Sequence, residues 1–199
     1  MAVMILTLDQ FGSPHRWSTW QEAVVYKAKD LVAWSQGEVS FRYRGGKNRI
    51  SGLQSEIIVP SIIAVKSDFY VKYRQTPLTN KNLFRRDLNT CAYCGGEYSD
   101  HKLTRDHIHP TSKGGQDIWM NTITACKVCN SYKSDRLLGE HYTDEHYLNG
   151  KIIELKYYPY IPDKAESMIL KNRILLKEQS DYLINLLPVH SRAGRLHVE

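Results

Sequence analysis

The sequence contains no long apolar run. The longest, Ile57 to Val65, is interrupted by Pro60 and Ser61. Because a membrane-spanning helix needs about 20 apolar residues, a membrane-spanning protein is excluded. The first residues, MAVMILTLDQ, lack the basic start and the small-residue cleavage site of a secretory signal, so secretion is not expected. We therefore expect a protein of the cytoplasm.

Internal repeats and low-complexity tracts are also absent, and neither sign of charge is strongly depleted. The chain has 199 residues, of which 42% are hydrophobic and 24% are charged. This composition is that of ordinary globular proteins and argues against wholesale disorder. The length suits one domain, or a compact core with extensions.

Acidic residues are scarce in one region. Between positions 39 and 86, ten Lys and Arg residues face only Glu56 and Asp68, a net charge of +8, whereas the whole chain carries +6. A basic stretch can be a solvated face or a surface that contacts phosphate groups. The run from Phe41 to Arg49 alternates aromatic and Arg residues before Gly45 and Gly46. It predicts a strand entering a hairpin turn, with Arg42 and Arg44 on one face.

Local patterns predict both helices and strands, which indicates an α+β fold. Strands are expected at 3–8, 56–65 and 152–158, and Pro60 marks an edge or a bulge. A capping box with Ser18 as N-cap and Gln21 at N3 predicts a helix to about residue 29. A short basic helix is expected at 79–87, capped by Thr79. A long amphipathic helix is expected from Asp163 to about Leu187.

The only four cysteines form two pairs with the same spacing, Cys91-Ala-Tyr-Cys94 and Cys126-Lys-Val-Cys129, with 31 residues between the pairs. Two thiolates at this spacing supply half of a tetrahedral Zn²⁺ site. Disulfides are one alternative, which a cytoplasmic chain makes less favourable. Redox activity is the other, and two such pairs with no further cysteine favour a metal site over it. A closed four-cysteine site contributes folding energy and does not catalyse.

The segment between and after these pairs contains Asp106-His107-Ile-His-Pro110, then Gly114-Gly115, Asn121, and Cys129-Asn130 with Lys133. In this run the sequence resembles the HNH endonucleases, the ββα-metal or His-Me finger nucleases. The region ahead of it is similar, more weakly, to the extended N-terminal part of a bacterial and phage subgroup. The resemblance implies a strand at 103–108, a loop, a strand at 122–125 and a helix from Asn130 to Arg136.

The chemistry of phosphodiester hydrolysis requires an attacking water, a base and a cation. His107 is the expected base, because a neutral imidazole titrates near working pH. Side chains of neighbouring strand residues diverge, so Asp106 can hold a metal while His107 faces the water. The resemblance implies the same roles. It also implies that Asn130 is the second ligand of a catalytic Mg²⁺ or Mn²⁺, and that Asn121 bonds across the loop to orient His107.

His109 departs from the family pattern, which often has an aliphatic residue here. It is an extra metal ligand, a phosphate contact or an exposed imidazole.

Eight basic side chains are candidates for DNA contact: Arg42, Arg44, Arg85, Arg86, Arg105, Lys113, Lys133 and Arg136.

The sequence thus predicts a ββα-metal (HNH) finger stapled by a four-cysteine zinc site. The predicted segments are an N-terminal α/β region that contacts DNA (1–78), the nuclease domain (79–140) and a C-terminal strand and long helix (141–199). The predicted function is a metal-dependent DNA endonuclease of a bacterial or phage-infected cell. The alternative is a zinc-stabilised DNA-binding module without catalysis. One active site cuts one strand, so a double-strand cut needs a homodimer or two sequential nicks.

Overall fold

The structure, a computed structural model, describes residues 3–66, 75–138, 155–172 and 175–194. The chain forms two compact units, each assembled from two stretches of sequence. Residues 1–75 and 164–187 make the first unit, and residues 76–163 and 188–199 make the second. The sequence predicted three consecutive segments. The structure instead groups residues 164–187 with the amino-terminal region, because the helices they form pack against its strands. No helix among the described residues is long and apolar enough to cross a membrane.

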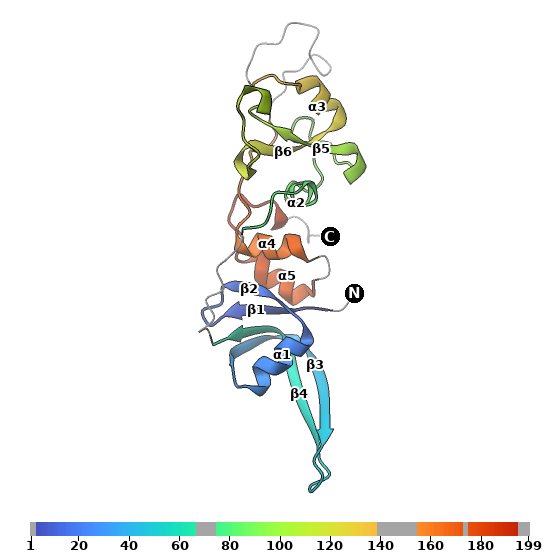
Figure 1. The fold of residues 1–199 in the computed structure, drawn as a ribbon, viewed down its shortest axis with the longest axis vertical. Helices are drawn as coiled ribbons and strands as arrows, with labels where there is room; N and C mark the ends of the chain where they lie inside the picture. The colour runs from blue at the N-terminus through green and yellow to red at the C-terminus, as the bar shows by residue number, and fades with distance from the viewer. Residues whose placement is uncertain (1–2, 67–74, 139–154, 173–174, 195–199) are drawn as a thin grey trace. The chain divides into compact units, whose positions relative to one another are not determined.

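The first unit is built on a four-stranded sheet in the order β2-β1-β4-β3 (Figure 1). Its strands are β1 (Ile5–Asp9), β2 (Pro14–Ser18), β3 (Val32–Lys47) and β4 (Gln54–Val65). β1 pairs antiparallel with β2 and parallel with β4, and β3 pairs antiparallel with β4. Ile5, Val59 and Ile63 form a buried cluster with Ala23 of helix α1 (Trp20–Ala28). The alternating apolar residues of the strands therefore supply the core of this unit.

The predicted cap of α1 is wrong by one residue. Thr19 is the N-cap, and its capping box is closed by Glu22. Ser18 cannot serve, because it ends β2 and its buried hydroxyl accepts a hydrogen bond of 2.7 Å from Thr7 Oγ1. The sequence allowed both registers of the box, and the pairing of β1 with β2 selected the second.

The predicted hairpin turn at Gly45 and Gly46 is also displaced. β3 continues to Lys47, and the chain turns between Asn48 and Leu53. The two glycines instead form a bulge between the pairs Arg44–Glu56 and Lys47–Gln54. A Cβ at Gly45 would collide with Ser55 Oγ, so a larger residue there would require the serine side chain to rotate.

The expectation for Pro60 is confirmed. Among the described strands, β4 pairs with β1 only from Ile62 onward, so at Pro60 it is paired with β3 alone. The register of β3 also shifts there, between Gln36 and Ser40. Proline lacks the N–H that a second partner strand would need.

The predicted long C-terminal helix is wrong, because two short helices take its place. They are α4 (Lys164–Lys171) and α5 (Lys177–Ile184). Leu176 is extended, with ψ of 149°, and caps α5. α4 packs against β2 whereas α5 packs against β3, so one straight helix would lose one of these contacts. Of the predicted strand 152–158, residues 152–154 lie outside the described part, and residues 155–158 form no strand.

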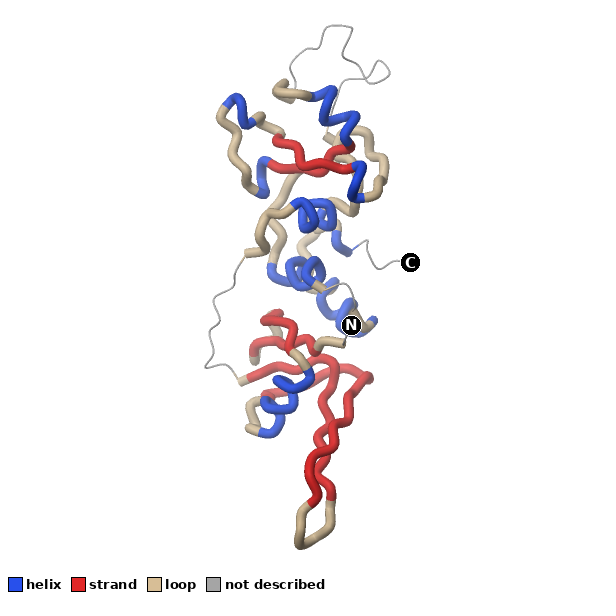
Figure 2. Tube along the Cα trace, turned by 45° about the vertical axis from the view of Figure 1, so that its right-hand side comes forward, coloured by secondary structure: helices blue, strands red, loops and turns tan. Residues whose placement is uncertain are grey.

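The second unit contains the predicted ββα order. α2 (Asn80–Arg86) is capped by Thr79 as expected and precedes the antiparallel pair β5 (Leu103–His107) and β6 (Thr122–Cys126). α3 (Lys127–Lys133) follows. Short 3-10 turns η1 (Asp100–Lys102), η2 (Thr111–Lys113) and η3 (Trp119–Asn121) lie between these elements (Figure 2).

The bounds predicted for the last helix of this unit are wrong. α3 begins three residues before Asn130, because Cys126 is its N-cap and Cys126 Sγ accepts a hydrogen bond from Cys129 N. It ends before Arg136, because Ser134 has a positive φ of 51°. Lys133 and Arg136 therefore do not share a helical face.

Candidate metal centres and active site

The four cysteines converge in the second unit. Cys91 and Cys94 flank a tight turn, and Cys126 and Cys129 lie at the start of α3. All four are free thiols, and their Sγ atoms lie within 4.8 Å of one another. A tetrahedral Zn²⁺ with bonds of about 2.3 Å places its sulfur ligands about 3.8 Å apart. The cluster therefore fits a metal ion such as zinc.

The surroundings of these thiols shift their pKa values. Burial raises the pKa of Cys91 to about 11 and also raises the pKa of Cys129. Burial acts in the same direction on Cys94, but hydrogen bonds from Tyr98 and Gly96 outweigh it and lower its pKa to about 7. Without a metal, the two buried thiols therefore keep their protons at neutral pH. A bound cation would hold them as thiolates and would release those protons.

β5 places Asp106 and His107 on opposite sides of the strand, as the sequence predicts. Asp106 is 5% exposed and points inward. Its Oδ2 accepts a hydrogen bond from the hydroxyl of Tyr93, which lies between the first two cysteines. Its Oδ1 lies 3.2 Å from Lys133 Nζ. The carboxylate therefore joins the cysteine turn to the end of α3.

Lys133 was expected to touch phosphate, and this prediction is wrong. Its side chain is 1% exposed, and besides Asp106 its Nζ donates a hydrogen bond of 2.7 Å to His107 O. A buried ammonium needs such partners, because an unpaired charge in the interior is costly. Lys133 thus ties α3 to β5 beneath the candidate site.

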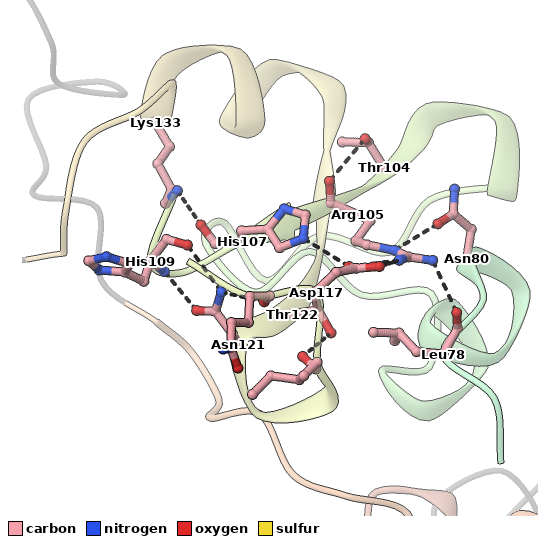
Figure 3. A network of polar contacts seen from close by, with 12 residues as sticks. Leu78, Asn80, Thr104, Arg105, His107, His109, Asp117, Asn121, Thr122 and Lys133 are labelled. Atoms are coloured by element: carbon pink, nitrogen blue, oxygen red, sulfur yellow. Dashed lines mark hydrogen bonds and ion pairs between the residues drawn. The ribbon is translucent and has the colours of Figure 1, made fainter. Parts of the chain in front are cut away.

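The ring of His107 contacts Asp117, a residue that the sequence analysis missed. His107 Nε2 lies 2.9 Å from Asp117 Oδ1. Both oxygens of Asp117 accept hydrogen bonds from Arg105 Nη1, at 2.8 and 2.6 Å, and Arg105 Nε donates to Asn80 Oδ1 (Figure 3). Hydrogen bonding from Arg105 lowers the pKa of the Asp117 carboxyl. Asp117 is therefore held as an anion beside the imidazole.

A signal for this pair was present in the sequence. Arg105 and His107 are two residues apart on a strand, so their side chains share a face. A carboxylate in the loop that follows, such as Asp117, is a natural partner for both. Arg105 was expected to contact DNA, but it is 19% exposed and its guanidinium is engaged by Asp117.

Asn121 bridges the loop that follows β5. Its Oδ1 accepts a hydrogen bond of 2.8 Å from His109 N, and its Nδ2 donates to His109 O and Gln116 O. The predicted bridge across the loop is thus present, although it contacts the backbone two residues after His107. A Cβ at Gly115 would overlap His109 O, so the loop requires glycine there. His109 is exposed, with Nε2 2.8 Å from Lys113 O, and its role among the three alternatives stays a prediction.

Asp106 and His107 line one pocket of about 300 Å³, together with Pro110, Thr111, Ser112, Lys133, Ser134 and Asp135. Carboxylate and hydroxyl oxygens dominate this lining and suit a hard divalent cation. Asn130, the predicted second ligand, is half-buried in α3 and is not among these residues. A cation at Asp106 Oδ1 would also compete with the Lys133 ammonium. Both carboxylate oxygens of Asp106 already have partners, Tyr93 and Lys133, so Asp106 and Asn130 both stay predictions as ligands of a catalytic metal.

Among the other basic candidates, Arg86 is corrected by the structure. It is fully buried, beside Asp87, and its guanidinium donates to Trp119 O, Tyr160 O and Thr122 O. It is a structural residue and cannot contact DNA. Arg44 and Lys113 are exposed, and Arg85 and Arg136 are half-buried. Arg42 is 62% exposed and pairs with Glu56 at 2.9 Å.

Comparison with known proteins agrees with this geometry. Residues 91–143 match a family described as HNH endonuclease, and this range includes the cysteine cluster and the pocket residues. Over 81 residues the chain is 32% identical to a Bacillus subtilis (strain 168) protein named "SPbeta prophage-derived putative HNH endonuclease YoqL". The match covers 34% of this chain and 34% of that relative, so about two thirds of each lies outside it.

Proposed function

We propose, from the match of residues 91–143 to a family described as HNH endonuclease, that the chain is a metal-dependent endonuclease that hydrolyses phosphodiester bonds of DNA. The observation that carries the proposal is the presence of Asp106 and His107 in one pocket within the segment that matches the family. This pair supplies an acceptor for a proton and a ligand for a cation, the two groups that hydrolysis needs.

His107 is the general base in this proposal. If its Nε2–H donates to Asp117 Oδ1, 2.9 Å away, the ring is held in one tautomer and Nδ1 is left as the acceptor. We assign this tautomer from the hydrogen-bond network. Nδ1 then takes a proton from the water that attacks phosphorus. Asp117 acts through His107 and is a positioning residue.

Asp106 would hold the divalent cation, Mg²⁺ or Mn²⁺, with Asn130 as the predicted second ligand. When bound, the cation supplies positive charge for the phosphate and the leaving oxygen. Asn121 would keep the loop closed behind His107 through its bonds to the backbone of His109. The cysteine cluster, as a zinc site, would fix the turn from which Tyr93 reaches Asp106.

The alternative, a zinc-stabilised DNA-binding module without catalysis, needs the cysteines and the basic side chains only. It gives no reason for an imidazole oriented by a carboxylate beside a pocket rich in oxygen atoms. The contact between His107 and Asp117 therefore supports the nuclease.

The test is cleavage of supercoiled plasmid DNA in Mg²⁺ and in Mn²⁺. His107→Ala should reduce the rate of nicking by at least about 100-fold, because a general base contributes about 10²–10⁴, while DNA binding is retained. His101→Ala is the matched control, since that ring is exposed and does not line the pocket. Full activity of His107→Ala would remove the assigned base. A wild-type chain that binds DNA but never cuts it would favour the alternative.

The products would also report how many copies act together. A single site yields nicked circles first, whereas a homodimer that places two sites on one duplex yields linear DNA without accumulating nicks. Sedimentation with a short duplex would then show one or two chains.

A further inference from the structure

The β3–β4 hairpin extends beyond the sheet of the first unit as a two-stranded ribbon (Figures 1 and 2). Its base is held by α1, where Trp20 stacks on Tyr43 with ring centroids 4.6 Å apart. Beyond that point every residue from 44 to 56 is exposed. We call residues 44–56 the ribbon. Because it buries nothing, its side chains are free to meet a partner.

The ribbon is basic, and most of its charge is unneutralised. Its one acidic residue, Glu56, is engaged by Arg42 at 2.9 Å. Within the part of the chain that the structure describes, no ion pair is found for Arg44, Lys47 or Arg49. Three cations on a narrow projection suit a polyanion.

The tip of the ribbon is a hydrogen-bonded loop that carries two exposed aliphatic side chains. Asn48 Oδ1 accepts hydrogen bonds of 2.8 and 3.0 Å from Ile50 N and Ser51 N, and Asn48 N donates to Leu53 O at 2.8 Å. These bonds hold Ile50 and Leu53 outward, where they are 98% and 73% exposed. Aliphatic side chains displayed on a preorganised loop, rimmed by charge, are typical of an interaction site.

From these observations we infer that the ribbon enters a groove of duplex DNA. Arg44, Lys47 and Arg49 contact phosphates on the walls, and Ile50 wedges against a base step and bends the duplex. Between the pairs Arg44–Glu56 and Lys47–Gln54 the ribbon advances by about 7 Å, at about 3.4 Å per residue of β4, and the turn at 48–53 extends it further, so its length matches a groove depth of about 8 Å. Apolar wedges that bend DNA in this way are known in groove-binding proteins. The inference rests on the proposed function for the identity of the partner.

The first arm of the test measures charge, in a His107→Ala background so that the DNA stays intact. The variant Lys47→Gln/Arg49→Gln should reduce the slope of log K against log salt concentration by about two, at about 0.9 per phosphate contact. The matched control is Lys27→Gln/Lys29→Gln, which removes the same charge from exposed positions on and beside α1. Equal slopes for the two variants would overturn the inference.

The second arm measures bending, by energy transfer between dyes at the two ends of a short duplex. Ile50→Ser should reduce the bend, whereas Ile58→Ser should not, since Ile58 is 46% exposed on the stem below the ribbon. Equal bends for wild type and Ile50→Ser would overturn the wedge.

Failure of this inference is distinguishable from failure of the proposed function. If the ribbon variants bind DNA like the wild type, and the wild-type chain cuts DNA, only the inference about the ribbon is overturned. A wild-type chain that neither binds nor cuts duplex DNA overturns the proposed function itself.

Discussion

Arg86 shows how much one charged side chain can organise in a small unit. Its guanidinium is fully buried, lies between the rings of Trp119 and Tyr160, and donates to the buried carboxylate of Asp87. It also joins α2 to η3 through Trp119 O and to the first residue of β6 through Thr122 O. This residue therefore links elements that are distant in sequence and positions β6 relative to α2.

The first prediction concerns the stability conferred by Arg86. Arg86→Met should lower the free energy of unfolding by about 3–5 kcal/mol, because it leaves the buried Asp87 carboxylate uncompensated. Lys81→Met on the same helix is exposed and should change it by less than about 0.5 kcal/mol. Urea unfolding of both variants would measure the difference. A small loss of stability in Arg86→Met would mean that apolar packing of the new side chain can replace the ion pair between Arg86 and Asp87.

The second prediction concerns Asp117 as the positioning residue for His107. Asp117→Ala should lower kcat for nicking by about 10- to 100-fold, as is typical of groups that orient a ligand or base, with KM little changed. Asp117→Asn should recover part of the loss, because its amide oxygen can still accept from His107 Nε2 and Arg105. A rise in KM with unchanged kcat would instead place Asp117 in substrate binding.

At the scale of elements, the break between α4 and α5 depends on one polar side chain. Gln179 is fully buried, and its Nε2 donates hydrogen bonds of 2.9 Å to Met4 O and to Ser61 O. Its Oε1 accepts from Leu176 N at the start of α5. Gln179 thus accepts the N–H of Leu176, the N-cap of α5, and anchors α5 to the sheet.

The third prediction follows from these bonds. Gln179→Leu should destabilise the first unit by about 1–3 kcal/mol, because the buried carbonyl of Ser61 and the partly buried carbonyl of Met4 lose their donor. Lys177→Met, exposed at the start of the same helix, is the control and should be nearly neutral. Thermal unfolding followed by far-ultraviolet circular dichroism would compare them. Equal melting temperatures for Gln179→Leu and Lys177→Met would contradict this prediction, and would mean that water replaces the hydrogen bonds of the Gln179 amide.

At the scale of the whole molecule, the two units differ in what stabilises them. The first has an aliphatic core of sheet residues, including Ile5, Ile62 and Ile63. The second has Cys91, Cys126 and Cys129 within its core cluster, beside Ile123 and Ala125. Small units with few aliphatic residues commonly depend on a structural metal.

The fourth prediction is that removal of metal affects the units unequally. A chelator should abolish hydrogen-exchange protection in β5 and β6 while β1 and β4 keep theirs, because a structural zinc site contributes about 10 kcal/mol or more to folding. Metal analysis before and after chelation gives the stoichiometry, and Cys126→Ser should reproduce the loss. Protection that is unchanged in β5 and β6 would contradict a structural metal.

The sequence by itself determined the features that depend on near neighbours. The Cys-x-x-Cys spacings predicted a cluster, the neighbours Asp106 and His107 diverged on a strand, and Thr79 capped α2 as expected. These predictions needed only the period of a strand, the geometry of a turn or the first turn of a helix, which are local properties of the chain.

Only the tertiary structure decided which charged side chains are buried and which strands the last two helices pack against. From the sequence, Arg86 and Lys133 were expected to be surface cations. Each is buried instead, because acceptors from distant elements form hydrogen bonds with its charged group. Asp117 became a partner of His107 through the path of a loop, and a single long helix gave way to two because α4 and α5 meet different strands. Such outcomes depend on contacts between residues far apart in the chain, which no local pattern specifies.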